Sequence, residues 1–193
     1  MRVFVAGATG VIGIRLVPLL VQAGHEVAAM TRTPSKVESL QRLGAQPVVC
    51  DVYDAGALRE AVVAAAPDVV IHELTDLPDD AARLDDFGDA NVRIRTEGTR
   101  NLLDAADAAG VKRFLAQSIA LQLPGRRGEA VGELEQMVTA YGGVAVRYGQ
   151  FYGPGTYHEN EPPDPPRVHI DEAARRTAEL LEHEPGIVTV GGD

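Results

Sequence analysis

Short apolar runs alternate with longer amphipathic stretches along most of the chain. The short runs are rich in valine and have the length of strands that are buried on both faces. The longer stretches carry apolar residues three and four positions apart, which is typical of helices packed on one side. The strands expected from this pattern are Val3–Ala6, Glu26–Thr31, Pro47–Cys50, Asp68–His72, Val111–Gln117, Val144–Tyr148 and Ile187–Val190.

The helices between these strands have recognisable boundaries. Glycine follows several of them, and proline opens one, as expected for helix ends and starts. The expected helices are Val11–Ala23, Pro34 to about Gly44, Asp54–Ala65, one long helix from about Asp79 to Ala109, Gly132–Tyr141 and Ile170–His183. We expect loops at Leu123–Gly128 and Gly153–Pro166. This alternation predicts an α/β fold, a doubly wound parallel sheet of the Rossmann type.

The composition excludes several classes of function. The chain has 193 residues, with 28 acidic and 18 basic side chains and a net charge of −10. Such a charge argues against nucleic-acid binding and against docking on anionic membranes. Cys50 is the only cysteine, so an internal disulfide and a cysteine-based metal site are excluded, and we expect no metal. No apolar stretch approaches the ~20 residues of a membrane span, and we expect a cytoplasmic protein.

A glycine-rich segment, Gly7-Ala8-Thr9-Gly10-Val11-Ile12-Gly13, lies between the first strand and the first helix. That context suits a dinucleotide site, because the start of the helix offers free N–H groups to phosphates. Gly7 would permit the tight turn, Gly10 the close approach of a pyrophosphate, and Gly13 close helix–strand packing. A glycine-rich turn without a ligand is the alternative.

Four further segments accompany the glycine spacing: Asp68–His72, Gly98–Phe114, Arg147–Gly155 and His169–Ala173. Together they resemble the short-chain dehydrogenase/reductase superfamily, in its extended or atypical branch of NAD-dependent epimerase/dehydratase-like proteins. The resemblance covers nearly the whole chain. It implies a single NAD(P)-binding domain over residues 1–193, in which residues 153–193 are a remnant of the family's substrate-binding region.

The end of the second strand bears on the choice of dinucleotide. An NAD-preferring site has Asp or Glu there for the ribose 2′-hydroxyl, whereas this chain has Thr31-Arg32. The Arg32 guanidinium can pair with a 2′-phosphate, and Arg15 could assist. We therefore expect NADP rather than NAD. Asp51 and Val52 resemble the family's adenine contact, although Asp51 could instead cap the third helix.

The family's catalytic tyrosine and lysine are absent. Glu135 aligns with a glutamate that follows the family's lysine by four residues, which puts that lysine at Val131 and the tyrosine at Arg127. Valine cannot hold a ribose hydroxyl, and arginine stays protonated, so it is no general base. The asparagine of the family is Arg95 here, with Asn91 one turn earlier.

Other side chains must then act at the carboxyl ends of the strands. Ser118 lies one position before the family's usual catalytic serine, which is Ile119 here. Ser118, Tyr148 and Tyr152 are the candidate catalytic residues, and each has a structural alternative in packing. Further candidates are Gln150, Tyr157, His158, His72 and Glu73.

The region that would hold the substrate is short. About a dozen loop residues separate Gly155 from Ile170, so we expect a pocket that is small and open, or one completed by a second copy in a homodimer. Three functions remain open. These are an NADP-dependent oxidoreductase or epimerase/dehydratase acting on a small molecule, a non-redox isomerase, cyclase or lyase, and an NADP-binding sensor.

Overall fold

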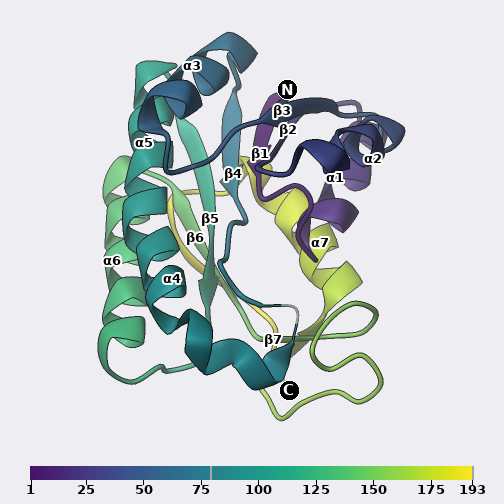
Figure 1. The fold of residues 1–193 in the computed structure, drawn as a ribbon, viewed down its shortest axis with the longest axis vertical. Coiled ribbons are helices and arrows are strands. Elements are labelled where there is room, and N and C mark those ends of the chain that lie inside the picture. Colours follow the sequence, from purple (N-terminus) through teal and green to yellow (C-terminus); the bar gives the residue numbers. More distant parts are fainter. Residues whose placement is uncertain (79, 193) are drawn as a thin grey trace.

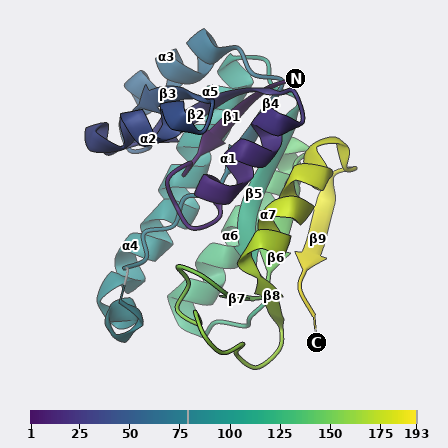
Figure 2. The same ribbon diagram turned by 90° about the vertical axis from the view of Figure 1, so that its right-hand side faces the viewer.

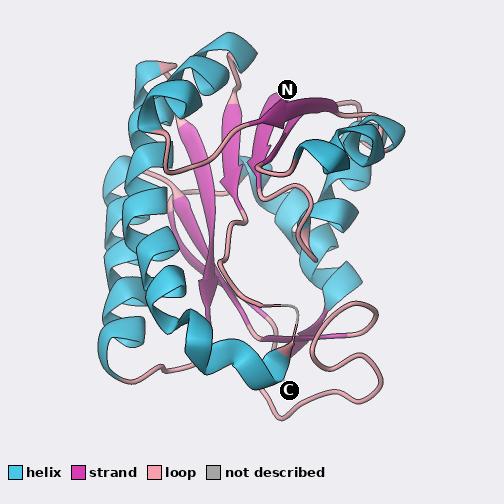
Figure 3. Ribbon diagram, viewed as in Figure 1, coloured by secondary structure: helices cyan, strands magenta, loops and turns pink. Residues whose placement is uncertain are grey.

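A parallel sheet is the centre of the computed structural model, which describes residues 1–78 and 80–192. Within those residues, seven strands lie in the order β3-β2-β1-β4-β5-β6-β9 (Figures 1 and 3). The strands are β1 (Arg2–Ala6), β2 (Glu26–Thr31), β3 (Gln46–Val49), β4 (Val69–His72), β5 (Arg113–Ile119), β6 (Val144–Tyr148) and β9 (Gly186–Val190). The winding direction reverses between β1 and β4, where such sheets bind ligands. The expected doubly wound α/β fold is confirmed.

Helices cover both faces of the sheet. α1, α2 and α7 lie on one face, and α3, α5 and α6 lie on the other (Figure 2). The α-helices are α1 (Gly13–Gln22), α2 (Val37–Arg42), α3 (Ala55–Ala65), α4 (Gly88–Arg93), α5 (Thr99–Ala108), α6 (Gly125–Tyr141) and α7 (Ile170–Glu179). Shorter helical turns are η1 (Pro34–Lys36), η2 (Ala81–Phe87), the π-helical η3 (Ile94–Gly98) and η4 (Leu180–Glu182).

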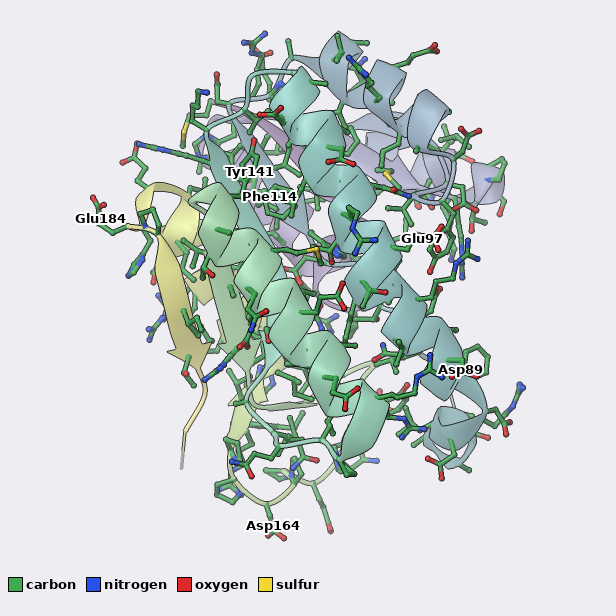
Figure 4. All side chains as sticks on the ribbon, turned by 90° about the vertical axis from the view of Figure 1, so that its left-hand side faces the viewer. Asp89, Glu97, Phe114, Tyr141, Asp164 and Glu184 are labelled. Atoms are coloured by element: carbon green, nitrogen blue, oxygen red, sulfur yellow. The ribbon has the colours of Figure 1, made fainter. Side chains whose placement is uncertain are left out.

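Each face of the sheet has its own apolar core. Leu16 and Leu20 of α1 are fully buried on one face, as their spacing of four residues predicts. On the opposite face, Phe114 of β5 meets Tyr141 at the end of α6, with ring centroids 5.8 Å apart and edge-to-face geometry (Figure 4). The Tyr141 hydroxyl also donates to the carbonyl of Val111, so its polar end is satisfied.

The expected loop at Leu123–Gly128 is wrong, because α6 already begins at Gly125. Pro124 is extended and precedes the helix, so its ring does not obstruct the helical hydrogen bonds. Gly128 lies within the helix. The position requires glycine because a Cβ atom there would lie 2.1 Å from the Leu123 carbonyl oxygen. The glycine serves a close approach of the chain and does not break the helix.

Two other expectations also need correction. The single long helix is divided into η2, α4, the π-helical turn and α5, and its expected first residue, Asp79, lies outside the described residues. Two short strands were not expected, β7 (Gln150–Tyr152) and β8 (Arg167–His169). They pair in parallel and join the two ends of the proline-rich segment 153–166.

The carboxyl edge of the sheet is where the less regular segments gather. η2, α4 and the segment 153–166 lie below the strand ends in Figure 1. These segments extend beyond the strands at the carboxyl edge of the sheet. Among the described residues, no helix has the length and apolar character needed to cross a membrane.

Two glycines of α6 give a matched test of this packing. Gly128→Ala should lower the free energy of unfolding by about 1–3 kcal/mol, because the new methyl group meets a backbone carbonyl. Gly132→Ala is the control, because a Cβ there meets nothing within 4 Å, and it should raise stability by up to about 1 kcal/mol. Urea unfolding measures both. Equal effects of the two substitutions would contradict this account of Gly128.

Candidate functional site

The turn between β1 and α1 lies directly against the chain that follows β4. Gly7 has a φ of 92°, and a Cβ atom there would lie 2.7 Å from the carbonyl carbon and oxygen of Glu73. A Cβ at Gly13 would lie 2.3 Å from the Gly7 carbonyl oxygen. Any side chain at these two positions would force the turn apart. These two glycines therefore leave a surface of bare backbone at the switch point between β1 and β4, which we call the glycine cradle.

The start of α1 offers unpaired donors to that surface. Ile12 is the N-cap residue and provides no side-chain cap. Within the described chain, the backbone N–H groups of Val11 and Ile12 make no hydrogen bond, whereas Gly10 donates to the Gly7 carbonyl at 3.0 Å. Free N–H groups at the positive end of a helix dipole fit the phosphates of a dinucleotide. The residues present thus suit such a cofactor.

Arg32 follows β2 and lies at the outer end of this surface. Its side chain is 64% exposed and pairs with Asp76 at 3.1 Å. Asp76 also accepts a hydrogen bond from the Tyr53 hydroxyl at 2.8 Å. Thr9 contacts Thr31 through their hydroxyl oxygens, 3.3 Å apart. The structure therefore brings the segment after β4 to the end of β2, a contact that the sequence did not indicate.

Asp51 and Val52 lie after β3, beside the same surface. The Asp51 carboxylate accepts the N–H of Tyr53 at 3.0 Å, and Val52 is buried, with its carbonyl bonded to the Asn101 amide. The cap of α3 is Asp54, whose carboxylate accepts the N–H of Ala57. Capping of the third helix is thus not the role of Asp51.

Arg15 has three partners that hold α1 to the C-terminal part of the chain. Its guanidinium donates to Asp171 at 2.7 Å, to the Val11 carbonyl at 2.8 Å and to the Pro154 carbonyl at 2.6 Å. Its side chain is 19% exposed. These contacts give Arg15 a structural role at the start of α7 and the proline-rich segment.

Ser118 lies at the end of β5 and is fixed by a buried carboxylate. Its hydroxyl donates to Glu135 at 2.6 Å. The same carboxylate receives two hydrogen bonds from the Arg147 guanidinium, at 2.7 and 2.6 Å. The hydroxyl proton of Ser118 is therefore directed to Glu135, while its oxygen lone pairs can accept a hydrogen bond.

Tyr148 lies at the end of β6, on the opposite face of the sheet from Glu135. Its hydroxyl contacts Thr177 of α7 at 2.5 Å and Glu73 at 3.2 Å. All three side chains are buried. Burial raises the pKa of the Glu73 carboxyl to about 8, although the Tyr148 hydroxyl bonded to it acts in the other direction.

Tyr152 belongs to a different part of the molecule. Its ring packs edge-on against His169 at a centroid distance of 5.2 Å. It lines a pocket of about 420 Å³ between α7 and the end of β9, together with Arg167 and Arg176. The three candidate catalytic residues therefore do not form one cluster.

The positions of the missing tyrosine and lysine are occupied by structural side chains. Arg127 donates to Asp85 at 3.1 Å and lies against Gly88, which holds α6 to the turn before α4. Val131 is buried. Neither residue supplies an acid or base at the end of β5.

Sequence reasoning missed the role of Glu135, which was used only to align the helix. The signal was available, because it stands among apolar residues on the buried face of α6, where an unpaired carboxylate is rarely tolerated. Asp76 had no such signal. In the described residues, no group of three His, Cys, Asp or Glu side chains could hold a metal ion.

Comparisons with known proteins agree with this geometry. A family model described as NAD(P)H-binding matches residues 7–141. A 3-diazoavenalumate denitrifying reductase of a Streptomyces species is 42% identical in an alignment 185 positions long, and the match covers 81% of this chain and 58% of that protein. A 3-beta-hydroxysteroid dehydrogenase of Mycolicibacterium neoaurum is 34% identical over 116 residues, covering 59% of this chain and 31% of the relative. The chain thus spans less than two thirds of the length of these relatives.

Solved structures show the same fold. The UDP-glucose 4-epimerase of Thermus thermophilus, in complex with NAD, has a TM-score of 0.79 at 20% identity, with 99% of this chain and 78% of the epimerase covered. The Thermotoga maritima enzyme with UDP-glucose has a TM-score of 0.80 at 20% identity, with coverages of 99% and 77%. The family model covers well over half of the sequence, and the glycine cradle lies within the match. This chain therefore belongs to the NAD(P)H-binding family of the short-chain dehydrogenase/reductase superfamily.

Proposed function

We propose that this chain is an NADPH-dependent reductase that delivers hydride to a small aromatic electrophile of the arenediazonium class. The observation that carries the proposal is the loss of the acid at the family's tyrosine position, where Arg127 is bound to Asp85. The resemblance to a relative named 3-diazoavenalumate denitrifying reductase suggests the substrate class.

The chemistry of this substrate class explains why the acid is dispensable. Bound NADPH would supply a hydride. Transfer of this hydride to an arenediazonium ion gives an arene and dinitrogen. A C–H bond forms, the C–N bond breaks, and dinitrogen leaves with the electron pair of that bond. The charges cancel without a proton from the protein. A carbonyl, in contrast, becomes an alcohol only when a proton reaches its oxygen.

Arg32 supports NADP rather than NAD as the cofactor. It follows β2, where an NAD site has a carboxylate, and its side chain is 64% exposed and therefore open to a 2′-phosphate. We assign the pyrophosphate to the N–H groups of Val11 and Ile12, and the adenine to Asp51 and Val52. The Asp76 carboxylate beside Arg32 would give way to the phosphate.

A second candidate function is carbonyl reduction, for which a relative named 3-beta-hydroxysteroid dehydrogenase gives a precedent. The observation that favours it is the buried carboxyl of Glu73, whose Oε1 atom accepts a hydrogen bond from the Tyr148 hydroxyl at 3.2 Å and whose Oε2 atom has no partner among the described residues. Burial raises the pKa of this carboxyl to about 8, so Glu73 holds a proton at neutral pH. That proton could serve the carbonyl.

The cofactor assignment predicts a selective loss. Arg32→Ala should weaken NADPH binding by about 10- to 100-fold, the equivalent of a charge-assisted hydrogen bond, and leave NADH binding unchanged. Arg100→Ala is the matched control, because Arg100 is 55% exposed and pairs with Glu133 on another face. Fluorescence titration with each nucleotide measures these affinities. Unchanged NADPH affinity in Arg32→Ala would rule out this role for Arg32.

The substrate class is tested by the stoichiometry of turnover. The protein should consume one NADPH for each dinitrogen released from an arenediazonium salt, as measured by absorbance and gas analysis. Gly13→Ala, which disrupts the cradle, corrects for direct reaction between the salt and NADPH and should abolish the catalysed rate. Turnover of steroid or aromatic ketones without turnover of the diazonium salt would favour the second candidate.

The state of Glu73 predicts a pH dependence of stability. Its pKa is raised from 4.5 to about 8 in the folded protein, so the folded state retains a proton that the unfolded chain loses. The Glu73 contribution to stability should therefore be full below pH ~4.5 and fall by roughly 3–5 kcal/mol as the pH rises to ~8. Glu73→Gln should remove this part of the pH dependence. Urea unfolding at several pH values measures it, and identical pH profiles would exclude a buried, protonated Glu73.

A further inference from the structure

Arg95 is a buried cation in an unusual turn of the chain. It belongs to the π-helical turn Ile94–Gly98, which joins α4 to α5, and wide turns of this kind are frequent at functional sites. The residue is 5% exposed. Burial lowers the pKa of its guanidinium to about 10, although Glu135 raises it, so Arg95 is charged at neutral pH. A buried charge of this kind requires an explanation.

The hydrogen bonds of Arg95 are incomplete. Its Nε donates to the Asn91 side-chain oxygen at 3.0 Å, and its two terminal nitrogens make no hydrogen bond to a described residue. The Nδ2 atom of Asn91 is fully buried and is also without a partner among the described residues. Two neighbouring side chains thus present N–H donors with no acceptor among the described residues. The unmet Asn91 donor is fully buried and costs about 1–3 kcal/mol.

The potential acceptors that lie near Arg95 form hydrogen bonds with other residues. Both carboxylate oxygens of Glu135 receive hydrogen bonds, from Ser118 and Arg147. The His72 Nδ1 atom accepts the N–H of Leu74 at 3.2 Å, and its Nε2 contacts Thr99 at 3.0 Å. Burial and the nearby Arg95 lower the pKa of His72 to about 3. His72 is therefore neutral and offers no charge to the guanidinium.

The position of Arg95 relates it to the reaction site. His72 ends β4 and is in register with Ala6 of β1 and Ala116 of β5, and Ser118 lies two residues beyond on β5. Arg95 interacts electrostatically with both His72 and Glu135. It therefore lies beside the carboxyl edge of β4 and β5, on the face covered by α3, α5 and α6.

We propose that Arg95 and Asn91 form the subsite for a carboxylate group of the substrate. The two terminal nitrogens of Arg95 offer the parallel donors that match a carboxylate, and Asn91 adds a third donor. A cationic diazonium group is repelled by the guanidinium, so the carboxylate end of the substrate binds here and the electrophilic end points away. This subsite rests on the proposed function, which places the substrate at this edge of the sheet and supplies the cationic group that sets its orientation.

The subsite is tested with unreactive probes, so that turnover is not needed. The protein, saturated with NADP⁺, is titrated calorimetrically with benzoate and with its neutral analogue benzamide. Benzoate should bind about ten-fold or more tightly than benzamide, and Arg95→Gln should remove that preference while benzamide binding stays unchanged. Inorganic phosphate is a further probe, and phosphate displacing benzoate would show a general anion site and overturn the carboxylate assignment.

Arg93→Gln is the matched control, because Arg93 lies two residues away and its guanidinium is 54% exposed and paired with Glu97. It should leave benzoate binding unchanged. If Arg95→Gln does not fold, Asn91→Asp gives an independent answer. The carboxylate of the new aspartate should accept hydrogen bonds from Arg95 in place of a ligand. This should raise the melting temperature and abolish benzoate binding.

Equal affinity of the wild-type protein for benzoate and benzamide would overturn the subsite, as would full benzoate binding in Asn91→Asp. Failure of diazonium turnover with intact benzoate selectivity would instead contradict the proposed reaction and leave the subsite standing. The two proposals therefore fail separately.

Discussion

The chain that follows β4 lies against Gly7 so closely that no side chain fits between them. This contact fixes where the turn after β1 can run, and with it the direction in which α1 begins. Because α1 begins there, its unpaired N–H groups point at the crevice between β1 and β4. The glycines, the strand order and the helix start are thus one constraint. It accounts for the cofactor surface without any contribution from a charged side chain.

A second constraint is the Glu135 carboxylate, which connects α6 to β5 and β6. Burial by itself raises the pKa of that carboxyl, but hydrogen bonds from Arg147 and Ser118 together bring it below the usual range. Glu135 therefore stays ionised and holds the Ser118 hydroxyl in one orientation. Its oxygens receive three hydrogen bonds from Arg147 and Ser118 and none from Arg95. The terminal nitrogens of Arg95 are therefore left without a hydrogen bond to this carboxylate.

The sequence was sufficient to predict the fold class and the glycine turn between β1 and α1, because both depend on local patterns. Valine-rich strands, amphipathic helices and the glycines between β1 and α1 can each be recognised within about ten residues. The start of α6 could not be predicted, because the requirement for glycine at position 128 comes from the Leu123 carbonyl packed against it. The strands β7 and β8 were missed because each has three residues and its partner lies beyond the proline-rich segment.

The candidate site was harder to predict than the fold for a similar reason. Arg32 was predicted as a cofactor contact from its position after β2. Its partner Asp76 was not predicted, because it belongs to a segment after β4 with no regular structure. Ser118 and Tyr148 were found on neighbouring strands, yet their side chains bond to residues on opposite faces of the sheet. Only the three-dimensional arrangement shows which of these groups already have partners.

The parallel sheet also has a consequence for how quickly the chain reaches its native state. β1 pairs with β2 and with β4, and β4 begins 63 residues after β1 ends. Parallel strands cannot be joined by a tight turn, so every pair in the seven-stranded sheet requires the closure of a long loop that contains a helix. The entropy of these closures is lost before the contacts compensate for it, which slows folding relative to a helical bundle of similar size. Until β4 pairs with β1, one edge of β1 stays unpaired.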